Sequence, residues 1–214
     1  MSARFLSLGL LIAALALTGC VMQKPCDYTN FLAHPPRSIV VLPPLNQSTD
    51  IKGTYGYLST VTRPIAEMGF YVFPVAEVDQ LMKENGLPTA GEMHAVSLGK
   101  IGEIIGADSV LYVTLRNYGS KYQVLSSVTT VTADAKLVDV KSGLTLWEGT
   151  ATAQQSSGDS GGGVIGALVT AAVTQVVNSA TDPAHDVSSL ANFQLFTPKK
   201  YGLLHGCYFP KEKE

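Results

Sequence analysis

The sequence predicts an α/β fold of the α+β type, in which a mixed sheet and its packing helices form a layered sandwich. Two hydrophobic patterns predict it. Before residue 107, short apolar runs alternate with stretches whose apolar residues recur every three or four positions, as in strands followed by helices. From residue 109 the period falls to two and Val, Thr and Tyr become frequent, which indicates an antiparallel meander.

The fold is expected to begin with a strand at 38–42. This run is apolar and β-branched and ends at two prolines, so it should be buried on both faces. A helix at 52–68 follows, with a kink or a late start at Pro64, and then a second strand at 70–75. Because a helix joins the two strands, the right-handed crossover rule predicts that they are parallel neighbours.

Further helices should precede the meander. One is expected at 76–85, and Thr89 followed by Glu92 matches a capping box, which predicts a helix start. The clearest part of that helix ends at Gly106. Three antiparallel strands are then expected, the last two joined by a tight turn at 141–143; they lie at 109–118, 124–140 and 144–154.

The amino terminus predicts a lipoprotein signal peptide at 1–19. Arg4 precedes an uncharged apolar run at 5–17, which is too short to span a bilayer. The run ends in Leu17-Thr18-Gly19-Cys20, which resembles the bacterial lipobox. The resemblance implies cleavage before Cys20, diacylglycerol on its thiol and an acyl chain such as palmitate on its new amine. An ordinary secretory cleavage near a cysteine is the alternative.

Lipidation at Cys20 would decide where the protein lies. Several acyl chains on one residue make a stable membrane anchor, because each buried methylene contributes about 0.8 kcal/mol. In lipoproteins of the enteric type, Asp after this Cys favours the inner membrane, so Val21 indicates the outer one. We therefore expect an outer-membrane lipoprotein with its domain in the periplasm, and exposure at the cell surface is the alternative.

Charge and length limit the possible functions. The chain has 15 Lys and Arg against 17 Asp and Glu, and its only basic clusters are Lys199-Lys200 and a mixed tail, which argues against nucleic-acid binding. Without the signal peptide the chain is long enough for one well-cored domain. We expect a tether at 20–36, a single domain at 37–209 and a disordered tail at 210–214.

Two cysteines remain once Cys20 is acylated. Cys26 and Cys207 lie at opposite ends of the mature chain in an oxidising compartment, so a disulfide between them is expected. Its long loop would give a chain-entropy stabilisation of about 5 kcal/mol at most. The alternatives are two unpaired thiols, or a metal site formed with His34 and His205. Because these spacings match no common zinc pattern, we expect no metal.

A glycine-rich segment at 155–166 matches three functional patterns. Residues 158–162 resemble the nucleophile signature of trypsin-like proteases and the elbow of α/β-hydrolases, with Ser160 as the nucleophile. Residues 161–166 also fit a dinucleotide-binding fingerprint.

None of these patterns has the sequence context that its chemistry needs. The elbow and the fingerprint should follow a parallel strand, but this segment follows the predicted meander. A protease would need upstream His and Asp partners, and His34 and His94 stand in no such setting. Abundant Gly and Ser predict a flexible connection to an amphipathic helix at 165–178. We expect no enzymatic activity and no cofactor, and a hydrolase using Ser160 is a remote alternative.

Several motifs together resemble known periplasmic domains. Three segments resemble the domain type shared by CsgG, LpoB and the amino-terminal domain of TolB. They are Ile39-Val-Val-Leu-Pro-Pro44, Ile104-Ile-Gly-Ala-Asp108 and the hairpin sequence from Lys136 to Trp147. A closer resemblance, to a family of lipoproteins known from a meningococcal surface antigen, is in Cys26-Asp-Tyr28 with Pro35-Pro-Arg-Ser-Ile-Val-Val-Leu-Pro-Pro44. This closer resemblance covers most of the mature chain.

The resemblance implies a protein that acts by contact. Its relatives include a secretion pore subunit, an activator of a peptidoglycan synthase and the partner-binding domain of TolB. We expect a non-catalytic accessory factor of secretion or surface assembly in a CsgG-like system, bound to other envelope lipoproteins or secretion components, with homo-oligomers possible. A peptidoglycan-synthase activator ranks second, because a tether at 20–36 would reach at most about 50–60 Å.

Overall fold

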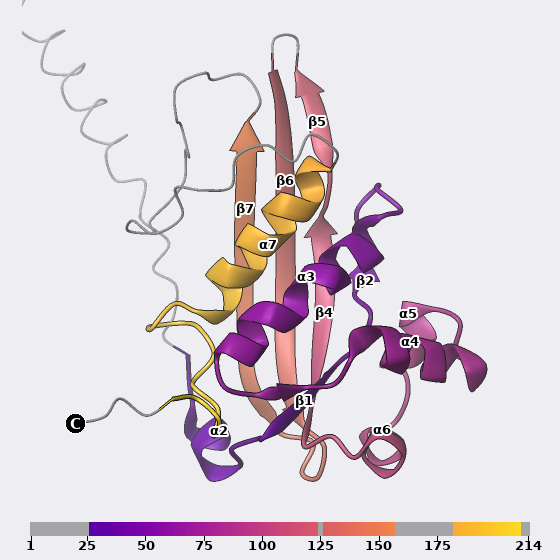
Figure 1. Cartoon of the computed structure of the whole chain (residues 1–214), viewed down its shortest axis with the longest axis vertical. Coiled ribbons are helices and arrows are strands. Elements are labelled where there is room, and N and C mark those ends of the chain that lie inside the picture. The colour runs from indigo at the N-terminus through magenta and orange to yellow at the C-terminus, as the bar shows by residue number, and fades with distance from the viewer. Residues whose placement is uncertain (1–25, 124–125, 157–181, 211–214) are drawn as a thin grey trace, which may run out of the picture.

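The computed structural model describes residues 26–123, 126–156 and 182–210 of the 214-residue chain. One mixed sheet of seven strands runs through it, and helices pack against the sheet (Figure 1). The strands are β1 (Ser38–Val41), β2 (Leu45–Asn46), β3 (Tyr71–Val72), β4 (Ser109–Asn117), β5 (Ser120–Gln123), β6 (Ser126–Asp139) and β7 (Thr145–Ser156).

The strand order confirms the predicted mixed topology. The central path is β3-β1-β4-β6-β5, with β2 also beside β4 and β7 beside β6. β1 is parallel to β3 and to β4, as the crossover rule predicted for the first two strands of the domain. The pairs of β6 with β4, β5 and β7 are antiparallel, which is the expected meander with one extra short strand.

Two of the seven strands continue others after a break. β1 and β2 both pair with β4, and the two prolines at 43–44 separate them because proline has no N–H for the ladder. β4 and β5 both pair with β6, and Gly119 lies between them with φ of 115°. A left-handed backbone of this kind favours glycine, so Gly119 permits the break between the two strands.

The described helices are α2 (Thr29–Ala33), α3 (Gly53–Glu67), α4 (Val75–Glu84), α5 (Ala90–His94), α6 (Leu98–Ile105) and α7 (Pro183–Phe196). The predicted capping box is confirmed, because the Thr89 side chain accepts from the Glu92 N–H and the Glu92 carboxylate accepts from the Thr89 N–H. The predicted strand at 70–75 is reduced to β3, since Pro74 is the N-cap of α4. Among the described residues, no helix is long and apolar enough to span a bilayer.

A kink or a late start was expected at Pro64, and the late start is wrong, because α3 begins at Gly53 and contains this proline. A proline inside a helix costs about 3 kcal/mol. Tyr57, Val61 and Ile65 on the same helix are fully buried against the sheet. Each such burial contributes about 1.5–3 kcal/mol, so the packing of α3 outweighs the missing hydrogen bond.

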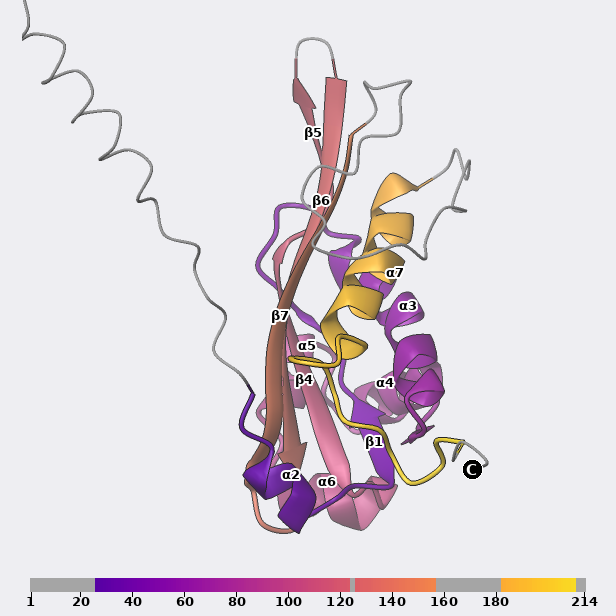
Figure 2. The same cartoon turned by 90° about the vertical axis from the view of Figure 1, so that its left-hand side faces the viewer.

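Two hydrophobic clusters lie on opposite sides of β1. Ile39 and Val41 join the larger cluster, with α3, α7 and the inward side chains of β4, β6 and β7. Val40 and Leu42 join a smaller cluster with α4, α5 and α6. The prediction that this first strand is buried on both faces is therefore confirmed. Viewed along the sheet, α3 and α7 lie together on one side of it (Figure 2).

Two helices were missed by the sequence analysis. α2 lies in the segment expected to be tether, and its Phe31 is only 3% exposed and packs edge-on against Phe70. α7 begins with Asp182, whose side chain accepts from the Ala184 N–H, and with a proline at its first position. An Asp N-cap followed by Pro is a recognisable helix start. The segment at 157–181, which includes Ser160 and the whole of the expected amphipathic helix, lies outside the described residues, as do the signal peptide and residues 211–214.

We predict that Phe31→Ala destabilises the whole domain although Phe31 lies in the predicted tether. Truncation of a buried phenylalanine removes about 3–5 kcal/mol from the free energy of unfolding. The matched control is Leu32→Ala, because Leu32 is 70% exposed on the same helix, and it should change that free energy by less than about 0.5 kcal/mol. Urea unfolding measures both, and equal effects would show that α2 is not part of the domain.

Candidate anchor junction and partner-binding surfaces

The chain leaves the folded body at a junction between its two ends. The Tyr28 hydroxyl donates to the carbonyl oxygen of Gly202 at 2.6 Å. The Cys26 thiol donates to the carbonyl of Tyr201 at 3.2 Å and lies 3.6 Å from that of Glu148. Burial, with the adjacent Cys26, raises the pKa of Tyr28 to about 12, so the hydroxyl remains a donor at physiological pH.

This junction shortens the expected tether. Residues 26–36 belong to the predicted tether, but they hydrogen-bond to the body and pack onto it from Cys26 onward. The connection between Cys20 and Cys26 has six Cα–Cα steps and spans at most about 20 Å. If Cys20 is lipidated as predicted, the body is held much closer to the lipid than the about 50–60 Å expected for a tether at 20–36. Cys20 itself lies outside the described residues.

The disulfide expected between Cys26 and Cys207 is not formed, and both thiols are free. The two cysteines have separate surroundings. Cys26 lies beside Tyr201, whereas Cys207 is exposed on a loop whose neighbouring N–H groups donate to the carbonyls of Met68 and Gly69. That loop takes Cys207 away from the junction along the end of α3.

The residues of the alternative metal site are not brought together. Within the described residues, no group of three or more His, Cys, Asp and Glu could hold a metal ion. His34 is exposed near the end of α2, and the His205 ring stacks on Phe209 with centroids 3.5 Å apart. The sequence-adjacent pair His205 and Cys207 thus has no ligand partner from the amino-terminal segment.

His94, a histidine upstream of Ser160, packs between distant segments of the fold. Its Nε2 lies 2.9 Å from the carbonyl oxygen of Pro43, and its ring meets Tyr112 edge-on at 5.2 Å. Burial lowers the pKa of His94, although the hydrogen bond to Pro43 opposes this. The contact joins α5 to the break between β1 and β2. Because Ser160 is outside the described residues, its position relative to any histidine stays open.

The face of β6 and β7 that points away from α7 is polar. Thr132 and Thr152 hydroxyls are 3.1 Å apart, and Lys136 lies 3.5 Å from Glu148 across the two strands. Asp134 forms an ion pair with Arg116 and accepts from the Thr150 hydroxyl at 2.7 Å. Such cross-strand pairs stabilise a solvent-exposed sheet face. These carboxylates are thus engaged in holding the sheet.

A hollow of about 610 Å³ borders this face. Residues of the polar ladder line it together with Cys26 and Tyr201 of the junction. A second groove of about 590 Å³ lies between α4, α5 and α6, and its lining is mainly apolar, including Leu81 and Ile104. These two concavities differ in their lining, because the first includes charged side chains of the ladder and the second is mainly apolar.

β7 presents a free edge above the junction. The Glu148 carbonyl faces Cys26, away from β6, and backbone groups alternate in direction along an antiparallel strand. The N–H and C=O groups of Thr150, Thr152 and Gln154 therefore also point outward. No hydrogen bond from outside the sheet to these backbone groups occurs in the described parts of the chain. The lower part of the edge is covered, since Asn30 of α2 donates to the Thr145 carbonyl at 3.0 Å.

Comparison with known proteins decides the family. The family model described as "Putative lipoprotein GNA1162-like" matches residues 26–208. A curated relative, Putative lipoprotein NMB1124/NMB1162 of Neisseria meningitidis serogroup B, is 46% identical over 206 residues, which cover 95% of this chain and 96% of the relative. The chain belongs to the GNA1162-like lipoprotein family. The predicted resemblance to lipoproteins known from a meningococcal antigen is therefore confirmed.

One solved structure agrees with this assignment, and a second, more distant one is also similar. The crystal structure of lipoprotein GNA1162 from Neisseria meningitidis is 48% identical, with a TM-score of 0.55, and the match covers 59% of this chain and 88% of that one. The LpoB carboxy-terminal domain from Salmonella enterica is 20% identical, with a TM-score of 0.40, over 56% of this chain and 83% of that one. Membership of the GNA1162-like family implies a lipoprotein attached to a membrane of the cell envelope.

We predict that His94 makes the stability of the protein fall in mild acid. Because burial lowers its pKa in the folded state, the unfolded chain takes up the proton first as the pH drops. The stabilisation is present above about pH 6.5 and is lost below it. The free energy of unfolding should therefore fall more between about pH 7 and pH 5 in the wild type than in His94→Gln. Equal falls in urea titrations at both pH values would contradict the assignment.

Proposed function

We propose that the protein is an outer-membrane lipoprotein whose domain faces the periplasm and holds other envelope proteins by contact, as a non-catalytic accessory factor of secretion or surface assembly. The observation that supports this most directly is the position of the free edge of β7. The strand that contacts the anchor junction through Glu148 continues into outward backbone groups at Thr150, Thr152 and Gln154. A partner strand added there would be held beside the membrane.

The composition of this edge favours strand addition. Residues 149–155 contain no charged side chain and no proline, which are the residues that natural edge strands use to prevent pairing. Backbone hydrogen bonds give such a complex its affinity, and side chains on alternate positions give it specificity. The residues whose backbone groups point outward are Thr150, Thr152 and Gln154. Their polar side chains suit a polar partner segment.

The arrangement of the acids supports a contact role over a chemical one. Asp134 is engaged by Arg116 and Thr150, and Asp108 accepts from the backbone N–H groups of Arg37 and Ser38 at 3.0 and 3.1 Å. These carboxylates fix strands in place. The remote hydrolase alternative depends on Ser160, and Ser160→Ala tests it: loss of function, or labelling of the wild type by a serine-reactive probe, would favour that alternative.

The second alternative, activation of a peptidoglycan synthase, depends on reach. With the body docked from Cys26 onward, the connection to Cys20 spans at most about 20 Å. This length favours partners that lie close to the anchoring membrane over an enzyme reached across the peptidoglycan. Crosslinking in cells distinguishes the two, because a synthase recovered as the main partner would support the activator.

We predict that Cys20→Ser abolishes membrane attachment. The hydroxyl cannot form the thioether that lipidation requires, so the variant should lose incorporation of labelled fatty acid and should leave the outer-membrane fraction of a density gradient. Cys207→Ser is the matched control, because Cys207 is an exposed free thiol remote from the signal, and it should remain acylated. A wild-type protein without acyl groups would refute the lipoprotein assignment.

We predict that Thr152→Pro weakens capture of envelope partners while the domain stays folded. Proline removes an N–H that points away from β6, so no bond of the β6–β7 ladder is lost. Thr152→Val is the control: like the proline variant it loses the hydroxyl contact with Thr132, but it keeps the N–H. Crosslinking in cells should recover fewer partners with proline than with valine. Equal recovery from both folded variants would exclude the edge as the binding site.

A further inference from the structure

Exposed apolar and cationic side chains gather at one end of the sheet, which we call the base. Four of its residues are large hydrophobic side chains that are 40–70% exposed. The other two are exposed cations. The base consists of Leu32, Arg37, Tyr71, Lys141, Leu144 and Tyr208.

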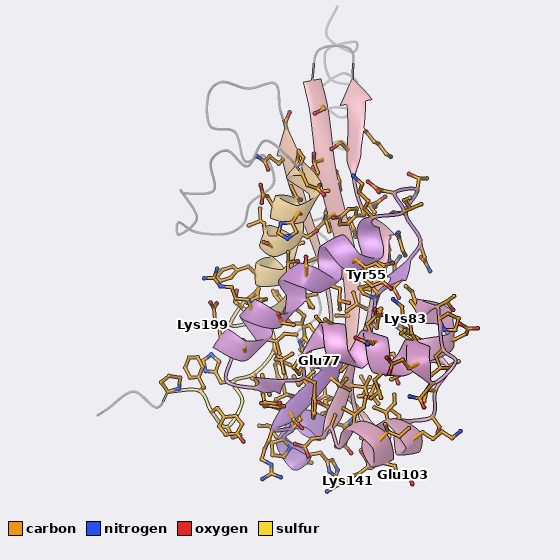
Figure 3. The ribbon with its side chains drawn as sticks, turned by 45° about the vertical axis from the view of Figure 1, so that its right-hand side comes forward. Tyr55, Glu77, Lys83, Glu103, Lys141 and Lys199 are labelled. Atoms are coloured by element: carbon orange, nitrogen blue, oxygen red, sulfur yellow. The ribbon has the colours of Figure 1, made fainter. Side chains whose placement is uncertain are left out.

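Contacts between distant segments bring these residues to the same end. Asn30 of α2 donates to the Thr145 carbonyl, which places α2 beside the turn between β6 and β7. Ser38 at the start of β1 pairs with Tyr71 at the start of β3. The Tyr208 N–H donates to the carbonyl of Gly69 at 3.1 Å, which places Tyr208 beside the residues that precede β3. Figure 1 shows α2 and the β6–β7 turn at the lower end of the molecule, and Figure 3 shows Lys141 there.

The short connection to the lipid brings the base to the membrane surface. Cys26 lies beside Glu148, four residues along β7 from Leu144, or about 13 Å above the base. A connection of about 20 Å then lets Cys20 extend at most about 7 Å beyond the base when the sheet stands upright. This distance is about the thickness of one headgroup layer, so in this orientation the base lies at the surface of the lipid.

We propose that the base is a second membrane contact, which rests in the headgroup layer of the membrane that holds the anchor. Its Leu and Tyr side chains would enter the interface, and Arg37 and Lys141 would meet lipid phosphates. Exposed apolar and aromatic groups mixed with cations are the composition of interfacial protein surfaces. The inference depends on the proposed lipidation of Cys20.

Acidic side chains near the base weaken the electrostatic attraction of its cations to lipid. The apolar side chains should therefore contribute more to the proposed contact. Arg37 is 3.9 Å from Asp108. Glu103 is on α6, which packs beside this turn, because Gly102 lies against the side chain of Val140. Asp139, in the same turn as Lys141, is buried and accepts from the Ser142 N–H and hydroxyl at 2.7 Å. These acids reduce the net positive charge that faces the lipid. The contact should therefore depend weakly on salt and strongly on Leu32, Leu144 and the tyrosines.

An upright orientation would present the partner surfaces to the periplasm. β6 has 14 residues and is about 45 Å long, and its Asp139 end is at the base. The free part of the β7 edge, which pairs with β6 around Thr132, would lie well above the lipid. The β5–β6 hairpin would point away from the membrane. The two proposals are thus compatible in geometry.

Fluorescence quenching from the membrane tests this orientation. Mature acylated protein with Cys26→Ser carries a fluorophore on its exposed native Cys207, next to Tyr208, in vesicles of phosphatidylethanolamine and phosphatidylglycerol with nitroxide headgroups. We expect strong quenching. The matched label is on Lys121→Cys, in a protein that also has Cys207→Ser. Residue 121 pairs with Val128, which is about 36 Å along β6 from Asp139. A fluorophore there should be quenched weakly.

A third label separates the orientations that the anchor allows. A fluorophore on Thr152→Cys, again with Cys207→Ser, reports on the β7 edge. Quenching there as strong as at Cys207 would mean that the body lies on this edge, and it would overturn the proposal. Vesicle-bound protein with no quenching at any label would also overturn it. Failure to bind vesicles, with no acyl group on Cys20 by mass spectrometry, would instead refute the lipidation.

A pair of variants tests the base residues directly. Leu32→Ser with Leu144→Ser should reduce the quenching at Cys207 at least severalfold, while the protein stays on the vesicles through its acyl chains. The control is Ile51→Ser, because Ile51 is 92% exposed at the start of α3, outside the base, and the quenching should not change. Both variants change only exposed side chains, so folding should be retained. Equal quenching in both would show that the base does not contact lipid.

Discussion

The carbonyl oxygens of Tyr201 and Gly202 hold the two ends of the chain together. They accept hydrogen bonds from Cys26, Tyr28 and the buried indole of Trp147, the last at 3.0 Å. Without this junction the amino-terminal segment would be a free tether of about sixteen residues, and the body could adopt any orientation at its end. With it, the chain leaves the body at one defined point on β7, and the distance of the body from its anchor is limited.

The sheet divides into two parts with different surroundings. β1 is covered on both faces because helices pack on either side of it, and it is accordingly apolar at every inward position. Among the described helices, α7 packs on one face of β6 and β7, so their residues alternate between apolar side chains and a polar ladder. The long antiparallel part of the sheet thus keeps a polar face and a free edge without exposing a large apolar surface.

The proposed partner surface and the proposed lipid contact are linked through the same strand. The lower half of the β7 edge is occupied by α2 and Cys26, and the upper half keeps its outward backbone groups. A short connection from the anchor and a stiff strand would therefore set the height at which a bound segment is held.

Local patterns in the sequence determined much of this architecture. The apolar run at 38–42, the capping box at Thr89, the turn at 141–143 and the parallel start each depend on neighbouring residues, whose period and turn chemistry can be read directly. The family was also visible in this way. Tertiary structure alone decided the folding of residues 26–36, the continuous helix through Pro64, the separation of Cys26 from Cys207 and the exposure of one strand edge. These features arise from contacts between segments far apart in the chain, such as Phe31 with Phe70 and Tyr28 with Gly202, and no local pattern encodes such partners.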